Sequence, residues 1–256
     1  MTFPNFPHKQ REKALVTPDI FRDYRKELGR YPEYDPPQGV IFVYQSQLMN
    51  YIVNNHPVTK VEGFFGDFYL LEDMNKQIGV LGNFGIGAPI IGILVEELVV
   101  FGVKKIISIG VAGSLQKNVQ LGSIILCDKA IRDEGTSHHY LPSEKYVYPS
   151  KVMKQAIENT INSIGGITYV SGTTWTTDAP YRETIAEVAQ YQEEGVITVD
   201  MEAAALFAVA EYRKVEVGAI FTISDYLGEL EWKPQFHLTK EHEKNLFLIA
   251  MKALST

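Results

Sequence analysis

The stretch Lys105-Ile-Ile-Ser-Ile-Gly-Val111 decides how the chain folds, because it is a run of branched apolar residues and glycine. A strand with one wetted face alternates apolar and polar residues, so this run predicts a strand that is buried on both faces of a sheet. From Gly39 onward, similar runs alternate with amphipathic stretches of helical length. That alternation is typical of an α/β protein whose sheet is largely covered by helices.

The same patterns predict where the elements lie. Strands are expected at residues 40–44, 58–65, 68–71, 77–81, 105–111, 123–127, 167–173, 196–199 and 216–223. Helices are expected at residues 19–28, 89–101, 151–163, 181–192, 201–212 and 240–254. Residues 1–38 are rich in proline, aromatic and charged residues, and we interpret them as an N-terminal arm packed on one domain formed by residues 39–256.

Composition and charge exclude several classes of protein. The 256 residues have a formal net charge of −7, which argues against a broad nucleic-acid footprint or a basic membrane-binding surface. Cys127 is the only cysteine, so an intramolecular disulfide or a cysteine-rich zinc site cannot form. Residues 1–12 lack the apolar core of a signal peptide, and the apolar run 88–95 is too short to span a bilayer. We therefore expect a cytoplasmic protein that binds neither nucleic acid nor membrane.

No motif indicates an organic cofactor or a metal. Gly85-Ile86-Gly87 begins like a dinucleotide-binding fingerprint, but Ile90 stands where the third glycine is needed. The adjacent His138 and His139 point in different directions, and no other histidine spacing favours a metal. We therefore expect neither a cofactor nor a metal.

One longer motif and several shorter segments carry a family resemblance. Asn83-Phe-Gly-Ile-Gly-Ala-Pro-Ile-Ile-Gly-Ile-Leu-Val-Glu-Glu-Leu98 resembles the signature segment of the family-1 purine and uridine nucleoside phosphorylases. Residues 108–113, 131–137, 199–204 and 222–225 resemble further segments of that family in the same order. The resemblance implies a three-layer α/β/α sandwich around a mixed, largely buried sheet. It also implies a homo-oligomer, a dimer or a hexamer.

The resemblance assigns the sugar and the base to different carboxylates. It implies that Glu202 binds the ribose 2′- and 3′-hydroxyls while Met201 packs against the sugar, and a carboxylate suits two hydroxyl donors because it only accepts hydrogen bonds. The alternative is that Asp200 or Glu202 merely caps a helix. Asp225, at the end of an expected strand, is implied to protonate N7 of a departing purine, which is a poor leaving group as an anion. An ordinary turn role is the alternative for Asp225.

Further residues are implied to line the substrate. Gly85 and Gly87 would let the backbone approach a phosphate, or would simply form a tight turn. Residues 173–182, with Thr174, Trp175 and Arg182, correspond to the loop that covers the base. In that loop Trp175 and Tyr181 would stack on the base or pack ordinarily, and Asp178 would pair with Arg182.

Three more positions complete the implied substrate contacts. Ser108 and Gly113 lie in a segment that corresponds to the family's substrate-binding turn. His8 corresponds to an N-terminal histidine that some relatives lend to the 5′-hydroxyl site of a neighbouring subunit, although a solvated histidine is the alternative.

The expected phosphate site departs from the family pattern. Residues 44–50 replace a Gly-Asp-Pro-x-Arg segment, Ser108 replaces an arginine, and Val111 replaces a hydroxyl residue. A doubly charged phosphate needs cations or strong donors once it is partly desolvated. Arg132 and Arg182 are the candidate substitutes, and each would otherwise order a loop.

Together these residues imply a pentosyltransferase, a nucleoside phosphorylase. It would cleave the N-glycosidic bond of a nucleoside with phosphate to give free base and pentose 1-phosphate. Asp225 favours a purine, whereas residues 131–137 with His138-His139-Tyr140 resemble the uridine-cleaving branch. Two alternatives stay open: a nucleosidase that uses water, and a nucleoside-binding protein without turnover.

Overall fold

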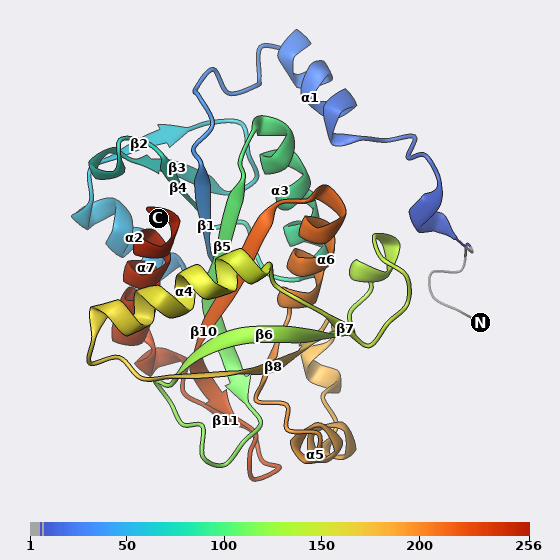
Figure 1. The fold of residues 1–256 in the computed structure, drawn as a ribbon, viewed down its shortest axis with the longest axis vertical. Coiled ribbons are helices and arrows are strands. Elements are labelled where there is room, and N and C mark those ends of the chain that lie inside the picture. The colour runs from blue at the N-terminus through green and yellow to red at the C-terminus, as the bar shows by residue number, and fades with distance from the viewer. Residues whose placement is uncertain (1–5, 7) are drawn as a thin grey trace.

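A mixed sheet forms the middle layer of the molecule, with helices on both faces (Figure 1). This computed structural model describes residues 6 and 8–256, so most of the first seven residues of the expected arm lie outside the described residues. The strands are β1 (Gly39–Val43), β2 (Val58–Val61), β3 (Asp67–Leu71), β4 (Ile78–Gly82), β5 (Lys105–Ser114), β6 (Ile124–Asp133), β7 (Tyr146–Val147), β8 (Tyr169–Thr177), β9 (Thr198–Asp200), β10 (Glu216–Tyr226) and β11 (Lys233–Pro234). The helices are α1 (Pro18–Glu27), α2 (Ser46–Asn55), α3 (Ala88–Phe101), α4 (Lys151–Ile164), α5 (Ile185–Glu193), α6 (Ala203–Arg213) and α7 (Lys240–Leu254). The expected three-layer α/β/α fold is confirmed.

Part of the sheet closes into a ring. β5 pairs with β10, β10 with β6, β6 with β8, β8 with β9, and β9 pairs back with β5. β1, β4, β3 and β2 extend the sheet from the other edge of β5. β1, β4, β5 and β10 run parallel, whereas β9 is antiparallel to β5. The carboxyl ends of β1, β4, β5 and β10 therefore meet at one edge, which is where α/β sheets place their ligands.

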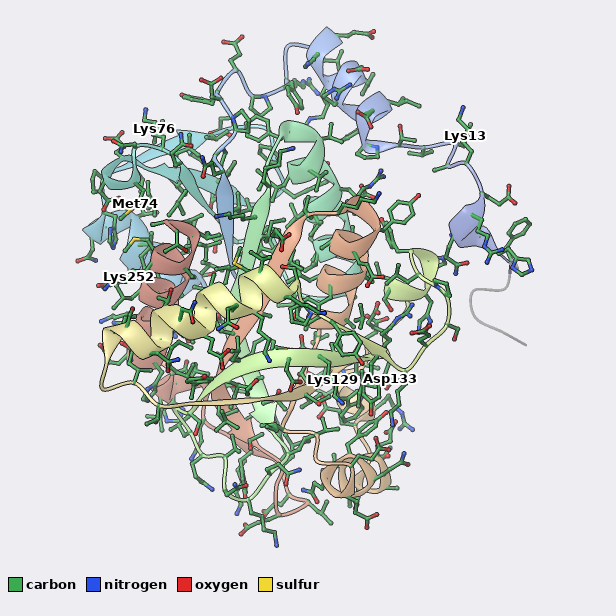
Figure 2. All side chains as sticks on the ribbon, viewed as in Figure 1. Lys13, Met74, Lys76, Lys129, Asp133 and Lys252 are labelled. Atoms are coloured by element: carbon green, nitrogen blue, oxygen red, sulfur yellow. The ribbon has the colours of Figure 1, made fainter. Side chains whose placement is uncertain are left out.

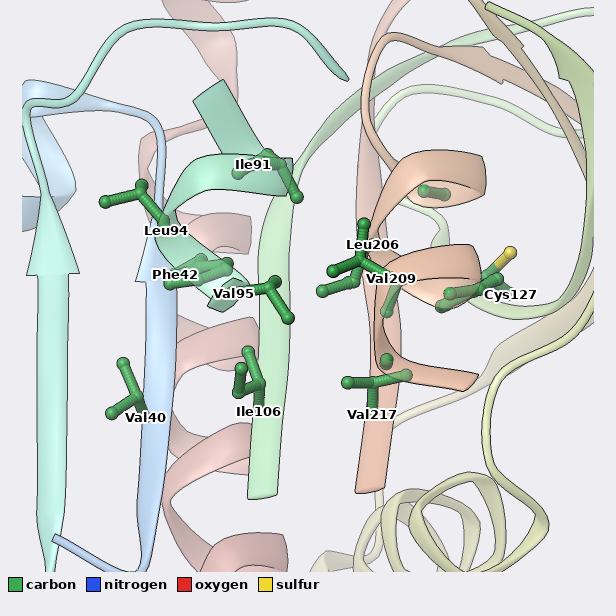
Figure 3. Packing of buried hydrophobic residues seen from close by; sticks show 14 of the residues in the cluster. Val40, Phe42, Ile91, Leu94, Val95, Ile106, Cys127, Leu206, Val209 and Val217 are labelled. Atoms are coloured by element: carbon green, nitrogen blue, oxygen red, sulfur yellow. The ribbon is translucent and has the colours of Figure 1, made fainter. Parts of the chain in front are cut away.

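The core of the first face lies under α3 and α6. Ile91, Leu94 and Val95 of α3 are fully buried against the sheet, and Leu206 of α6 belongs to the same cluster on the same face (Figure 3). α6 is buried all round, from Ala203 to Ala210. α3 and α6 pack on each other, and their N-cap residues Gly87 and Glu202 share a hydrogen bond, so their amino-terminal ends lie close together.

The opposite face is covered by α2, α4 and α7. α7 packs on β1, β5 and β10, and α4 packs on α7. Ile107 and Ile109 of β5 belong to this second cluster, whereas Ile106 belongs to the first. The apolar run of residues 105–111 is thus buried on both faces of the sheet, as predicted.

Several strands differ from their expected bounds, and for β2 and β6 local geometry gives the reason. β2 ends at Val61 rather than at residue 65, since Gly63 and Gly66 have φ of 107° and 84° and form a turn. β6 continues six residues beyond Cys127 to Asp133, because a bulge at Asp128 lets the strand change register against β8.

Four of the six expected helices begin within one residue of their predicted start, two were predicted to begin too early, and one helix was missed. α5 starts at Ile185 rather than 181, because Thr184 and Glu187 form a capping box after a 3₁₀ turn at Pro180–Arg182. α6 starts at Ala203 rather than 201. α2 was not predicted at all, and its N-cap Gln45 makes no side-chain cap.

The described part of the N-terminal arm runs along the α3 and α6 side of the molecule (Figure 1). Arg25 of α1 forms an ion pair with Glu97 of α3 at 3.3 Å. Lys9 Nζ lies 2.8 Å from His139 Nδ1, and Gln10 donates to the carbonyl of His138 at 2.7 Å. Among the described residues, no helix is both long and apolar enough to cross a membrane.

Candidate active site

Asp200 holds the turn between β9 and α6. Its Oδ2 accepts from the backbone N–H groups of Glu202 at 2.9 Å and Ala203 at 2.7 Å, so it satisfies the first amides of α6. Its Oδ1 accepts from the hydroxyls of Thr174 at 3.1 Å and Thr176 at 2.7 Å. Burial raises the pKa of Asp200, against the effect of these four hydrogen bonds. The helix-cap alternative considered for two carboxylates thus applies to Asp200.

The side chain of Glu202 does not cap α6, and it points towards the start of α3. Its Oε1 accepts from the backbone N–H of Gly87, the N-cap of α3, at 2.6 Å. Burial, and then the nearby Asp200 charge, raise the pKa of Glu202 to about 8. The sequence motif around Gly87 and the Asp-Met-Glu motif therefore meet at one point, with Met201 half-buried in the same turn.

The turn before α3 needs its two glycines. Gly85 and Gly87 have φ of 91° and 105°, a region that other residues rarely adopt, although a Cβ at either position would meet no close neighbour. The glycines are therefore explained by backbone conformation. Gly87 also donates its amide to the site.

Asp225 is re-aimed by an irregularity in β10. The register against β5 shifts at Ser224, the residue before Asp225, and bulges of this kind are common beside active sites. Asp225 Oδ1 accepts from the Ser224 hydroxyl at 2.7 Å, and Oδ2 accepts from the indole N–H of Trp232 at 2.8 Å. A Cβ on Gly113 would lie 3.0 Å from Asp225 Oδ2 and 2.9 Å from Val199. Gly113 therefore leaves room for Val199 of β9 and Asp225 of β10.

Glu183 adds a further carboxyl group beside Asp225. It follows the 3₁₀ turn Pro180–Arg182 and is half-buried. Burial first, and then the charge of Asp225, raise the pKa of Glu183 to about 7. The sequence analysis missed this residue, because nothing in a lone glutamate before a helix cap distinguishes it from a surface residue.

Tyr44 and Ser108 bring together two positions that depart from the family pattern. Their hydroxyls share a hydrogen bond of 3.0 Å, and the Tyr44 ring packs edge-on against Phe84 with centroids 5.3 Å apart. A Cβ on Gly110 would lie 2.9 Å from this ring. Burial, and then the charge of Glu202, raise the pKa of Tyr44 well above its usual range. An uncharged pair of hydroxyls thus lies within electrostatic reach of Glu202.

Trp175 and Thr174 point into the protein. Trp175 is 1% exposed, its ring lies 4.9 Å from that of Tyr191, and its indole N–H donates to Asp133 Oδ2 at 2.9 Å. Asp133 is labelled in the second half of β6 in Figure 2. Trp175 offers no open ring face to a base, so the packing alternative fits this placement and the stacking hypothesis is corrected. Thr174 is fully buried and supports Asp200.

The candidate phosphate arginines do not converge on Glu202. Arg132 is buried, and its guanidinium donates to Ser137 Oγ at 2.9 Å and to the carbonyls of Leu141 and Pro142 at 3.2 and 2.6 Å. It therefore orders its own loop, which was the alternative considered. Arg182 is exposed on the 3₁₀ turn.

Asp178 and His8 were also expected to make specific contacts, and the contact expected of His8 with a neighbouring subunit stays a prediction. Asp178 does not form the expected ion pair with Arg182; its Oδ2 accepts from the Gly135 amide at 2.8 Å. His8 is exposed on the arm of its own chain with φ of 58°.

Carboxyl groups that have no cationic partner among the described residues gather at the edge of the sheet. Asp178, Asp200, Asp225 and Glu202 lie there, and none of them takes part in an ion pair within residues 6 and 8–256. In the same described part of the chain, no group of three or more His, Cys, Asp or Glu residues is arranged to hold a metal ion.

Comparison with known proteins agrees with this geometry. Residues 46–253 match the family described as the phosphorylase superfamily. The chain belongs to the phosphorylase superfamily. This superfamily member is 32% identical over 197 residues to the purine nucleoside phosphorylase DeoD-type of Streptococcus thermophilus, which covers 75% of this chain and 87% of that protein. The resemblance stated from the sequence is confirmed.

Solved structures of the superfamily include both phosphorolytic and hydrolytic enzymes. An AMP nucleosidase from Bacteroides thetaiotaomicron superposes with a TM-score of 0.74 and 25% identity, covering 93% of this chain and 96% of that chain. A uridine phosphorylase from Vibrio fischeri ES114 superposes with a TM-score of 0.74 and 28% identity, covering 88% and 93%. The chain is thus similar to enzymes of both kinds, nucleoside phosphorylases and a nucleosidase.

Proposed function

We propose that the protein cleaves the N-glycosidic bond of a purine nucleoside and releases the free base. The observation that carries this proposal is the placement of Glu202. Asp200 takes over the helix cap, which frees the neighbouring Glu202 to reach Gly87 at the edge of the sheet. Glu202 is a half-buried carboxyl group that accepts the Gly87 amide and forms no ion pair in the described structure, so it is suited to accept hydrogen bonds from two sugar hydroxyls.

The reaction assigns one role to each carboxyl group. The bond between C1′ of the ribose and N9 of the purine breaks, and its electron pair stays on the base. Asp225 donates a proton to N7, so the base leaves as a neutral molecule. Positive charge develops at C1′ and the ring oxygen, as in other glycosyl transfers, while an oxygen nucleophile attacks C1′ from the opposite side. Glu202 holds the sugar in place throughout.

The nucleophile is phosphate in the phosphorolytic form of this reaction. The relatives named purine nucleoside phosphorylase and uridine phosphorylase support that form. Its products are the free base and pentose 1-phosphate, and it needs no organic cofactor.

Water is the second candidate nucleophile, and a specific observation favours it. Ser108 is bonded to Tyr44, Arg132 is committed to its loop, and the carboxylates at this edge make no ion pair in the described structure. A phosphate dianion placed here would face carboxyl groups and neutral hydroxyls, and desolvation without a cation is costly. Water carries no such cost. The AMP nucleosidase neighbour supports the hydrolytic form.

A panel of nucleosides with and without phosphate tests the proposal. Purified protein is incubated with inosine, adenosine or uridine in phosphate-free buffer and again with added phosphate, and free base and sugar products are separated. Release of purine base is expected. Pentose 1-phosphate formed only with phosphate would establish phosphorolysis, and free pentose formed without phosphate would establish hydrolysis. If no nucleoside releases its base in either buffer although binding is measurable, the proposal is overturned in favour of a binding protein.

A further inference from the structure

We propose that Trp232 is the positioning residue for Asp225 and that its indole ring forms one wall of the base subsite. This inference rests on the proposed function, because Asp225 is the proton donor there. Trp232 donates its indole N–H to Asp225 Oδ2 at 2.8 Å, while 58% of Trp232 is exposed. The buried carboxyl group of Asp225 is therefore hydrogen-bonded to an aromatic side chain that is exposed at the surface.

The loop that carries Trp232 is fixed at both ends next to Asp225. At its start, Leu227 donates its N–H to the Ser114 carbonyl at 2.8 Å. At its end, Pro234 pairs with Asp225 in the β10–β11 ladder, and Gln235 donates to the Ser224 carbonyl at 2.8 Å. Trp232 is thus held beside Asp225 by the backbone, independently of its own side-chain hydrogen bond.

The two hydrogen bonds to Asp225 leave a defined direction for the substrate. Ser224 approaches Oδ1 and Trp232 approaches Oδ2, so the plane of the carboxyl group is fixed. Asp225 is only 8% exposed, and a heterocycle whose N7 reaches it must lie next to the exposed Trp232 ring. Offset or edge-on packing of two aromatic rings is favourable, and the indole is large enough to cover a purine.

The chain contains only two tryptophans, and they differ in their exposure and in the aspartate that they contact. Trp175 is buried and donates to Asp133, whereas Trp232 is exposed and donates to Asp225. Any change of tryptophan fluorescence caused directly by a bound base is therefore expected to come from Trp232.

Two measurements on Trp232→Phe test the inference. The first compares inosine with 7-methylinosine, whose base carries a methyl group on N7 and leaves without receiving a proton. Trp232→Phe is expected to lower kcat/KM for inosine on the order of tenfold or more, the scale of one hydrogen bond to a charged group, and to change the value for 7-methylinosine about twofold or less. Glu229→Gln, which breaks the Glu229–Lys233 ion pair in the same loop, should leave both values unchanged.

The second measurement titrates hypoxanthine and follows tryptophan fluorescence. Quenching is expected in the wild-type protein and in Glu229→Gln, and is expected to be lost in Trp232→Phe. This titration needs no turnover, so it still decides the inference if the wild-type protein cleaves neither nucleoside and the proposed function fails. Equal losses with both nucleosides, no loss with either, or quenching that survives in Trp232→Phe would each overturn the role given to Trp232.

Discussion

Replacing Glu202 by glutamine separates its structural bond from its proposed chemistry. The amide oxygen of Glu202→Gln can still accept from the Gly87 N–H, which Glu202 Oε1 accepts at 2.6 Å. The second carboxylate oxygen becomes an NH₂ group, which cannot accept from a ribose hydroxyl. Losing one charge-assisted hydrogen bond and weakening another corresponds to about 2–4 kcal/mol, or roughly 30- to 1000-fold in kcat/KM. The free energy of unfolding at acidic pH should change by only about 1 kcal/mol or less.

The pH dependence gives this prediction a second readout. The pKa of Glu202 is about 8, well above its usual value of 4.5, because the side chain is buried beside Asp200. Glu202 is therefore largely neutral at pH 7, and kcat/KM of the wild-type protein is expected to rise as Glu202 ionises towards pH 8. Between pH 4.5 and 8 the folded protein binds more protons at this group than the unfolded chain does, so the stability contributed by Glu202 falls as pH rises. Glu202→Gln should flatten both trends.

The assay is steady-state kinetics of base release between pH 5.5 and 9, combined with denaturant unfolding over the same range. Glu193→Gln, an exposed position at the end of α5, is the matched control and should behave as the wild type. Wild-type activity in Glu202→Gln would remove Glu202 from sugar binding. An unfolding free energy with the same pH slope in both proteins would show that burial does not perturb this carboxyl group.

The remaining predictions concern four positions. Asp225→Asn should lower turnover of inosine by at least about a hundredfold, as loss of a general acid does, and should spare 7-methylinosine; equal losses in steady-state assays would contradict the proton-donor role. Asp200→Ala should lower the free energy of unfolding by about 2 kcal/mol or more in denaturant titrations, because α6 loses its cap, and an unchanged midpoint would refute that cap. Arg132→Met should also destabilise the protein by about 2 kcal/mol or more, since its loop loses three hydrogen bonds. If Arg132→Met instead folds normally and selectively abolishes a phosphate dependence, Arg132 is a phosphate ligand after all. Tyr44→Phe should alter base release in phosphate-free buffer if the Tyr44 hydroxyl lies at the nucleophile position; an unchanged rate would place it outside the reaction.

Local patterns predicted most of the fold because they report burial directly. The apolar run in β5 and the amphipathic helix α7 were placed closely, since both signals lie within one element. α2 was missed because Ser46–Asn55 contains five Asn, Gln and Ser residues and begins without a side-chain cap. The second half of β6 was missed because Asp128 and Lys129 look like a loop, whereas a bulge keeps them in the strand.

The sequence named candidate site residues, but it could not show which contacts each of them makes. Asp200 and Glu202 are two residues apart, so the sequence could not tell which one caps α6 and which one turns towards Gly87. Trp175 was considered because it lies in the segment expected to cover the base, and Trp232 was not considered because no motif points to it. Only the tertiary structure shows that β10 and the loop after it bring Trp232 to Asp225. Thr174 and Thr176 on β8 support Asp200, and their spacing of two gives the one local sign that they share a face.

A crystal structure with formycin B tests the central claim most directly, because this nucleoside analogue has a carbon–carbon bond in place of the cleavable bond. We expect a Glu202 carboxylate oxygen within about 3.2 Å of the ribose 2′- or 3′-oxygen, and an Asp225 oxygen at the same distance from the base nitrogen that corresponds to N7. An analogue that binds elsewhere, or binds here with both carboxyl groups turned away from it, would contradict the account.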